Sequence, residues 1–281
     1  MFFWNRNSKN MSEEFIQSRQ NPRVKSLIKL QDRAGRRKMG LFTVEGLREL
    51  SRCAELCGLD EIYYCPEFFK SQEHARFIDS IRDNSKVPLC RLSEGAFEKI
   101  SNREGCDGLL GVAKQWGCQL CDITLPENKP VIILIADAIE KPGNLGALMR
   151  TADSSGAAAM ILTNPVSDIF NPAVVRASQG ALFSIQLAVA TPTDVSKWLK
   201  QRNIKAFGAH LGAKNMLWDT DFKNSSAIVV GSEKDGLGAD WENLLDEKVK
   251  IPMSGVSDSM NVNVAAAVFL YEVMRQQNGA K

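Results

Sequence analysis

The chain has 281 residues, of which 44% are hydrophobic and 24% are charged, as in ordinary globular proteins. Its 35 basic and 33 acidic side chains leave a net charge of only +2, which excludes a chain that is basic or acidic throughout. The apolar runs, of which 131–136 is an example, are far shorter than the roughly 20 residues that a membrane-spanning helix requires, so no membrane partner is expected.

The amino terminus carries no convincing secretion signal. Met1-Phe-Phe-Trp is apolar, but Asn and Arg follow at once, and no small-residue cleavage site is present. We therefore expect a cytoplasmic protein whose first residues, 1–14, form a tail without function. Met11 is an alternative start of the chain.

The seven cysteines are scattered, and only two histidines, His74 and His210, are present. In a chain of this size without a secretion signal, such thiols are expected to be reduced and to pack as small hydrophobic side chains. Cys118 and Cys121 have C-x-x-C spacing, but no second Cys or His pair stands at a distance that would complete a zinc site. The sequence thus favours a protein without a metal.

Positive charge is concentrated near the amino terminus. Between Arg19 and Lys38 there are eight basic residues and a single acid, Asp32. Such a bias is typical of a surface that contacts phosphate, although a solvated helix face gives the same pattern. The residues of this segment that we expect to contact phosphate are Arg23, Lys25, Arg33, Arg36 and Arg37.

The first part of the chain predicts a small α/β domain at 15–116. Asn21 followed by Pro22 marks a helix start, and short apolar runs then alternate with segments of helical periodicity. The expected strands are 41–44, 61–64, 87–92 and 108–113, and the expected helices are 46–56, 68–82 and 94–100. Residues 117–129 are polar, contain proline and lack periodicity, so we expect a linker there.

A second α/β series occupies 130–281. Because strands alternate with helices, we expect a mostly parallel sheet that helices cover on both faces. The expected strands are 131–136, 158–162, 184–187, 205–209, 226–230 and 248–251. The expected helices are 145–155, 172–180, 193–202, 239–245 and 262–276.

Three polar loops of this second domain follow predicted strands, and parallel sheets bind ligands outside the carboxyl ends of their strands. The first loop, 137–150, has glycines at 143 and 146 that permit close approach of a backbone. Asn144 either caps the following helix or belongs to a site, and Arg150 is either a solvent-facing cation or a functional one.

The second loop, 231–238, has a glycine at each end and directly follows an apolar strand. Glu233 at this strand exit can accept a hydrogen bond from a ribose hydroxyl or from an arginine. Glu233 and Asp235 would equally suit the first turn of a following helix, because acids stabilise a helix amino terminus.

The third loop, 251–264, is unusually polar. Ser259 suits the cap of the last helix, but a cap needs only one residue. The polar residues crowded into this one turn are Ser257, Asp258, Ser259, Asn261 and Asn263. This surplus favours a polar pocket.

A dinucleotide-dependent oxidoreductase is an alternative, because Pro142-Gly-Asn-Leu-Gly146 follows a predicted strand. The full G-x-G-x-x-G pattern is absent, and the next strand ends in Thr163-Asn164, where an acid should meet the ribose. The sequence disfavours this class.

Together and in this order, the three loops resemble the motifs of the SpoU or TrmH-type branch of the SPOUT RNA ribose methyltransferases. The matching segments are 140–156, 176–180, 230–238, 251–253, 258–267 and 270–272. The similarity covers residues 130–275, and the three motifs are specific only jointly. Residues 21–50, which include Phe42-Thr-Val-Glu-Gly-Leu-Arg48, resemble the small amino-terminal RNA-binding domain common in this family.

The resemblance implies an α/β fold in which a small amino-terminal α/β RNA-binding domain precedes a SPOUT-type parallel-sheet catalytic domain. The carboxyl end of that domain would be tied into a trefoil knot, against the general rule for protein chains. The family works as homodimers that use S-adenosylmethionine to methylate a ribose 2′-hydroxyl of RNA, and the added domain favours large-subunit ribosomal RNA. A transfer-RNA 2′-O-methyltransferase and a non-catalytic RNA-binding or ribosome-assembly protein of this fold are the alternatives.

Carried over position by position, the resemblance also assigns site residues. The positions of the catalytic constellation are Asn144, Arg150, Glu233, Ser259 and Asn261. The positions that contact the cofactor are Val230, Gly231, Ile251, Met253, Met260 and Val262. Arg176 is a further expected RNA contact. Arg150 would be either the base that accepts the hydroxyl proton or an electrostatic stabiliser of the developing alkoxide.

Overall fold

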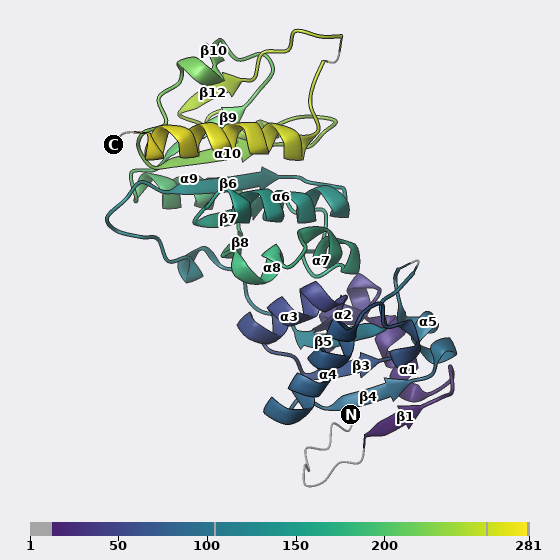
Figure 1. Cartoon of the computed structure of the whole chain (residues 1–281). Coiled ribbons are helices and arrows are strands. Elements are labelled where there is room, and N and C mark those ends of the chain that lie inside the picture. The colour runs from purple at the N-terminus through teal and green to yellow at the C-terminus, as the bar shows by residue number, and fades with distance from the viewer. Residues whose placement is uncertain (1–12, 104, 257, 280–281) are drawn as a thin grey trace. The chain divides into compact units, whose positions relative to one another are not determined.

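The computed structural model describes residues 13–103, 105–256 and 258–279 (Figure 1). The chain divides into two compact units, Met1–Gln115 and Trp116–Lys281. Residues 1–12 of the expected tail, which include the alternative start Met11, lie outside the described residues, as does Ser257 of the third loop. Glu14, the last residue of that expected tail, begins a strand.

The first unit is built on a five-stranded mixed sheet in the order β1-β4-β3-β5-β2. Its strands are β1 (Glu14–Ile16), β2 (Leu41–Glu45), β3 (Glu61–Tyr64), β4 (Leu89–Leu92) and β5 (Leu109–Lys114). Its helices are α1 (Pro22–Lys29), α2 (Arg33–Met39), α3 (Leu47–Leu56), α4 (Gln72–Asn84) and α5 (Glu94–Ile100), with a 3-10 turn η1 (Pro66–Phe68). Apolar side chains of α1, α5 and the sheet form its core, among them Val24, Leu27, Leu92, Phe97 and Leu110.

The basic amino-terminal segment folds as two short helices. Asn21 caps α1, because its side-chain oxygen accepts a hydrogen bond from the amide of Arg23 at 2.8 Å, and Pro22 occupies the first helical position. The helix start predicted at these residues is thus confirmed. The second helix, α2, ends at Gly40, whose left-handed backbone (φ 65°) stops it.

The second unit is built on a seven-stranded sheet in the order β10-β12-β9-β11-β6-β7-β8, and every described strand pair in it is parallel. Its strands are β6 (Ile132–Asp137), β7 (Ala159–Thr163), β8 (Leu187–Val189), β9 (Lys205–Ala209), β10 (Asn215–Met216), β11 (Ser226–Val230) and β12 (Glu247–Lys250). Its helices are α6 (Pro142–Ser154), α7 (Pro172–Ser178), α8 (Ala181–Ser184), α9 (Pro192–Lys200) and α10 (Val262–Asn278). Three 3-10 turns complete it: η2 (Leu120–Asp122), η3 (Leu217–Asp219) and η4 (Ala239–Trp241).

Helices cover this sheet on two faces, as the sequence predicted. On one face, Trp198 of α9 and Trp241 of η4 pack with alternate strand residues such as Ile133, Ile135 and Val229. On the other face, α10 packs against β6, β11 and α6, and α6 also contacts α7 and α8 (Figure 1). The two faces use alternate residues of each strand, as the pleat requires.

Three expectations about this unit need correction. The strand expected at 184–187 begins only at Leu187, because α8 occupies the chain as far as Ser184. The helix expected at 239–245 is only the 3-10 turn η4. Residues 117–129, expected as a linker, pack on the second unit: Ile123 is buried in its core, and the Cys118 carbonyl accepts a hydrogen bond from Val189.

Within the described part of the chain, no helix is both long enough and apolar enough to cross a membrane. The parallel α/β class of the second unit and the α/β class of the first are confirmed. The trefoil knot stays a prediction, since it concerns how the segments that surround α10 are threaded.

Candidate functional site

The two central strands of the parallel sheet, β6 and β11, end side by side. Ala136 of β6 is in register with Val230 of β11, so the loops that follow the two strands leave the same edge of the sheet. The chain continues from β6 to β7 on one side, whereas β11 lies on the other side. Such a topological switch point is where open α/β sheets bind ligands.

Asn144 lies in the segment that follows β6. It does not cap α6, which corrects one of the two roles considered for it: Lys141 is the N-cap residue, Pro142 begins the helix, and Asn144 lies in the first turn. Its side chain is therefore free to face the neighbouring loop. The Asn144 Nδ2 donates a hydrogen bond to Glu233 Oε1 at 2.9 Å.

Glu233 lies in a turn that closes on itself directly after β11. The amide of Ser232 donates to the carbonyl of Gly236 at 2.9 Å, and the amide of Gly236 donates back at 3.1 Å. Gly231 is required here, since a Cβ at this position would collide with the backbone of Gly236. Glu233 forms part of this turn, not of a helix, because the next helical residues are those of η4.

Three side chains meet at Glu233. Its carboxylate forms an ion pair with Lys141 and accepts hydrogen bonds from Asn144 and from Asn261, the latter at 2.8 Å. The hydrogen bond from Lys141 is the main cause that lowers the pKa of Glu233 below its ordinary value of 4.5, and the bond from Asn144 adds to it. Glu233 is thus held as a carboxylate.

Asn261 brings the third loop to the same place. It is the N-cap residue of α10, and its Oδ1 accepts a hydrogen bond from the amide of Asn263 at 3.0 Å. The cap expected of Ser259 is therefore wrong. The Asn261 Nδ2 points the other way, toward Glu233 Oε1 and, at 3.3 Å, toward Asn144 Oδ1.

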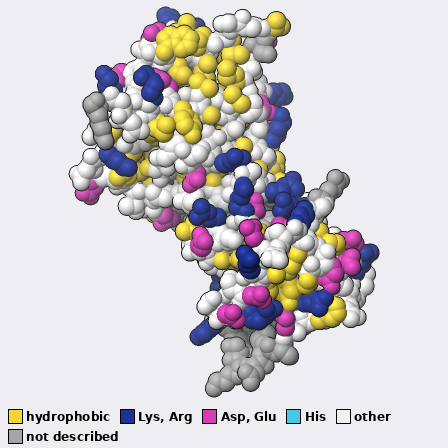
Figure 2. Space-filling view, viewed as in Figure 1, with side chains coloured by type: hydrophobic (Ala, Val, Ile, Leu, Met, Phe, Trp, Pro, Cys, Tyr) yellow, Lys and Arg dark blue, Asp and Glu magenta, His cyan; other side chains and the backbone are white. Residues whose placement is uncertain are grey.

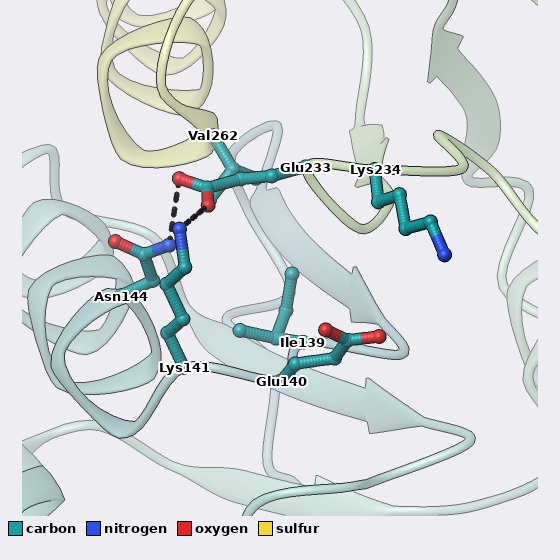
Figure 3. Close-up of a pocket in the computed structure, with 7 residues that line it drawn as sticks. All are labelled: Ile139, Glu140, Lys141, Asn144, Glu233, Lys234 and Val262. Carbon is teal, nitrogen blue, oxygen red and sulfur yellow. Dashed lines mark hydrogen bonds and ion pairs between the residues drawn. The ribbon is translucent and has the colours of Figure 1, made fainter.

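A cavity of about 190 Å³ opens beside this group. Figure 3 shows Lys141 and Asn144 directed at Glu233, with Glu140 and Lys234 set apart from them. The residues that line the cavity are Ile139, Glu140, Lys141, Asn144, Glu233, Lys234 and Val262. All come from the first loop, the second loop or the start of α10, so the three loops do converge on one cavity.

Two of the five residues expected in the catalytic constellation stand apart from this group. Arg150 is exposed on α6 and makes no hydrogen bond or ion pair with any residue that the structure describes. Ser259 and its neighbour Asp258 are exposed in the segment before α10, and neither bonds to Glu233. Asn263 turns instead to α6, where its Oδ1 accepts from Thr151 at 2.7 Å.

The six positions expected to contact a cofactor lie around the second and third loops. Val230 is buried at the end of β11, and Gly231 opens the turn that follows. Ile251 and Met253 are half-buried after β12, whereas Met260 is 37% exposed. Val262, the first residue of α10, is buried and is the member of this set that lines the cavity.

Two of the residues expected to contact phosphate bond instead to other residues of the first unit. Arg36 is only 1% exposed, and its Nη1 donates to the carbonyls of Leu30 and Gln31 at 2.9 and 2.7 Å, so the structure does not support a phosphate contact there. Arg23 forms ion pairs with Glu14 and Glu61 and lies over the ring of Tyr63. The remaining members are exposed: Lys25, Arg33 and Arg37 on α1 and α2, and Arg176 on α7.

The sequence reasoning missed Lys141 and Asp137. Lys141 precedes Pro142 and is a charged residue next to a predicted strand exit, which was the only signal for it. Asp137 is fully buried at the end of β6 and accepts hydrogen bonds from the side chains of Thr163 and Asn164 at 2.7 and 3.0 Å. An acid that ends an apolar run was the available signal.

Across the residues that the structure describes, no group of His, Cys, Asp and Glu is arranged to hold a metal ion. The site is instead made of a carboxylate, a lysine and two amides at the exits of parallel strands. These features define an α/β protein whose ligand site lies at the switch point of a parallel sheet, joined to a second, smaller α/β unit.

Comparisons with known proteins identify the family. The family model "SpoU rRNA Methylase family" matches residues 131–271, half of the chain, and the model "MRM3-like substrate binding domain" matches residues 21–111. The chain therefore belongs to the SpoU rRNA methylase family, and the resemblance drawn from its motifs is confirmed.

Individual relatives cover nearly the whole chain. The 23S rRNA (guanosine(2553)-2′-O)-methyltransferase RlmP of Bacillus subtilis (strain 168) is 27% identical over 92% of this chain and 98% of its own length. The crystal structure of an RNA 2′-O ribose methyltransferase is 34% identical, covers 94% of this chain and 99% of its own, and has a TM-score of 0.78. AviRb of Streptomyces viridochromogenes, a SpoU methyltransferase crystallised with AdoMet, is 26% identical over 93% of this chain and 100% of its own, with a TM-score of 0.83.

Proposed function

We propose that this protein transfers a methyl group from S-adenosylmethionine to the 2′-hydroxyl of a ribose in large-subunit ribosomal RNA. Family membership and the names of the relatives support the reaction and the class of RNA. The observation that carries the proposal is the convergence of Asn144, Glu233 and Asn261, from three separate loops, on one cavity.

The residues around the second and third loops fit this cofactor. Val230, Ile251, Met253, Met260 and Val262 are apolar side chains, of the kind that an uncharged adenine ring requires, and Gly231 begins the turn that follows β11. These six residues would hold the cofactor. When bound, S-adenosylmethionine supplies an activated methyl group, and no metal is needed.

The polar group acts on the ribose. Because Glu233 stays ionised, it holds the Nδ2 atoms of Asn144 and Asn261 toward itself and fixes the orientation of both amides. A ribose hydroxyl in the cavity would donate to this carboxylate. Alignment of the ribose oxygen with the methyl carbon and the sulfur of the donor contributes roughly 7–11 kcal/mol in favourable cases.

Arg150 and Ser259 complete the proposed constellation. A guanidinium is a poor base because it holds its proton tightly, so we assign Arg150 to the substrate phosphate and to stabilisation of the developing alkoxide. Ser259 would reach the nucleophile from the exposed segment before α10. Full activity of Arg150→Ala would remove Arg150 from both roles.

The first unit would hold the RNA. It matches a substrate-binding domain model, and Lys25, Arg33 and Arg37 are exposed on α1 and α2. Arg176 would add a contact from the second unit. Such residues bind the phosphate backbone and position the RNA without reading its sequence. A cytoplasmic location remains part of the proposal.

A homodimer is the proposed assembly. Val264, Val268 and Tyr271 are spaced by four and three residues, so they share one face of α10, and they are 48%, 37% and 45% exposed. Figure 2 shows hydrophobic side chains at the surface in the region where Figure 1 places α10. Sedimentation of Val264→Glu should show monomers if this face joins two copies, and an unchanged dimer would exclude the face.

The experiment that tests the function uses the purified chain with S-adenosylmethionine carrying a radioactive methyl group. Large-subunit ribosomal RNA and transfer RNA, both from cells that lack the gene, are the two substrates. We expect label in ribosomal RNA at one ribose 2′-oxygen, and labelling slower on the order of 100-fold with Glu233→Gln. Label in transfer RNA alone would mean that the substrate is transfer RNA and not ribosomal RNA. If no RNA is labelled and calorimetry detects no cofactor binding, the protein would be an RNA-binding protein without methyltransferase activity.

A further inference from the structure

We infer that Asp137 is a positioning residue, whose buried carboxylate fixes the turn that carries Gly231 and Glu233 against the end of β6. The inference rests on the proposed function, because it concerns how the same site is held. It adds a residue that touches neither of the proposed substrates and that none of the motif positions includes.

Asp137 connects three segments of the site. Its Oδ1 accepts hydrogen bonds from Thr163 Oγ1 at 2.7 Å and from Asn164 Nδ2 at 3.0 Å, which ties β6 to the exit of β7. Its Oδ2 accepts from the amide of Gly238 at 3.1 Å. Gly238 ends the turn that contains Glu233, so one carboxylate holds the far end of that turn.

The direction of these bonds requires a carboxylate. Trp241 Nε1 donates to Thr163 Oγ1 at 3.4 Å, so the Thr163 hydroxyl uses its own proton on Asp137. All three partners of Asp137 are thus donors, and an ionised carboxylate is an acceptor only. An asparagine at this position would present an NH₂ group to at least one donor.

The burial of Asp137 points to a function beyond folding. Its side chain, Thr163 and Trp241 are fully buried, and Asp137 forms no ion pair with a described lysine or arginine. A buried carboxylate without a cation is costly unless it is fully hydrogen-bonded, and an apolar side chain would fill such a place more cheaply. This acid lies where the turn with Glu233 is anchored, since its Oδ2 accepts from the amide of Gly238.

Asp137 also adjoins the other wall of the cavity. The next residue, Ala138, has a left-handed backbone (φ 51°), and its amide donates to the carbonyl of Thr163 at 3.0 Å. Ile139 and Lys141 of the cavity follow directly. Asp137 therefore sets the relative position of the two walls, one carrying Lys141 and the other carrying Glu233.

The test compares Asp137→Asn with Asp246→Asn in the full chain. Asp246 is the matched control, because its Oδ2 also accepts a backbone amide, that of Ala206 at 2.7 Å, at the amino ends of β9 and β12. Three quantities are measured: the Kd for S-adenosylmethionine by calorimetry, kcat and KM with RNA, and hydrogen exchange of the segment 231–241.

For Asp137→Asn we expect a Kd about tenfold higher, since a hydrogen bond to a charged group is lost. We expect kcat to fall on the order of 100-fold with an unchanged KM for RNA, because the displaced group positions the reacting atoms. Exchange in 231–241 should accelerate in Asp137→Asn and stay at the wild-type rate in Asp246→Asn. Wild-type exchange and Kd in Asp137→Asn would overturn the inference.

A second variant, Thr163→Val, keeps the inference testable if Asp137→Asn does not fold. It removes the hydroxyl that orients Asp137 and leaves the acid in place, so faster exchange in 231–241 is again expected, and an unchanged rate would contradict the inference. If the wild-type chain binds no S-adenosylmethionine, the proposed function fails. The exchange rates still decide the role of Asp137 in that case, so the two failures are distinguishable.

Discussion

Glu233 is the acceptor on which Lys141, Asn144 and Asn261 converge. Replacement by glutamine keeps the size of the side chain, but removes its charge and offers an NH₂ group to donors. We expect Glu233→Gln to lower kcat on the order of 100-fold with little change in Tm, because the site loses its alignment while the turn remains closed. Asp235→Asn, the same change in the same turn, is the control and should retain activity. Equal losses in both variants would mean that only the local charge matters.

The pH dependence tests the same carboxylate. The pKa of Glu233 is lowered, so the contribution of its carboxylate is present above its ordinary value of 4.5 and is lost only as the pH falls through the lowered pKa. The ratio of wild-type kcat to that of Glu233→Gln should therefore stay constant between about pH 5 and pH 8. A ratio that declines with a midpoint near neutrality would show that Glu233 is not held as a carboxylate in the working enzyme.

Arg36 and Arg37 are neighbours with opposite surroundings. Arg36 is buried and donates to two backbone carbonyls, whereas Arg37 is exposed. Arg36→Ala should destabilise the first unit by about 3 kcal/mol, because two buried acceptors lose a charged donor. Arg37→Ala should change stability by less than about 0.5 kcal/mol. Thermal unfolding of both variants checks this, and equal stabilities would contradict the structural role of Arg36.

At the scale of elements, Gly146 shows how α6 is held against α7. A Cβ on Gly146 would lie 2.6 Å from the carbonyl oxygen of Val174 and 2.8 Å from the amide of Ser178, both backbone atoms that cannot yield easily. Gly146→Ala should therefore destabilise the second unit by about 1–3 kcal/mol. Gly143→Ala, one turn earlier with open space around it, should stabilise by about 0.5 kcal/mol. Chemical denaturation of both variants distinguishes these signs.

The elements that the sequence predicted well are those with a strong local signal. The apolar runs that became β6, β9 and β11 and the periodic stretch that became α10 needed no knowledge of their neighbours. The expected strand at 184–187 failed because a short helix and a short strand lie within one apolar stretch, where periodicity does not separate them. The edge strand β10, of two residues, carries no pattern at all.

The site was predicted only in part, for a similar reason. Motif likeness gave Asn144, Glu233 and Asn261, which the structure brings together. The identity of a helix cap depends on where the helix begins to within one or two residues. The cap expected of Ser259 was therefore wrong, as was the cap considered as one of two roles for Asn144. Lys141 and Asp137 act through residues that are distant in sequence, and no local pattern reports such partners.

At the scale of the whole molecule, the charges and the cavity belong to different units. The basic residues of α1 and α2 lie in the first unit, and the cavity at Glu233 lies in the second. Changes to the charges should therefore alter RNA binding and leave cofactor binding unaffected. Because of this separation, a variant that lacks the basic residues tests RNA binding without disturbing cofactor binding.

The triple variant Lys25→Ala, Arg33→Ala and Arg37→Ala should weaken RNA binding and flatten its dependence on salt. Each lost phosphate contact lowers the slope of log K against log salt by about 0.7 to 0.9, so the slope should fall by about 2 to 3. The control replaces Arg52, Arg76 and Lys86, which are exposed elsewhere on the same unit, and so matches the change in net charge. Filter binding over a range of salt measures both slopes, and calorimetry should give an unchanged Kd for S-adenosylmethionine. Equal slopes in the two triple variants would mean that RNA binding depends only on the net charge of the unit. The basic residues of α1 and α2 would then be solvent-exposed charges without a specific RNA contact.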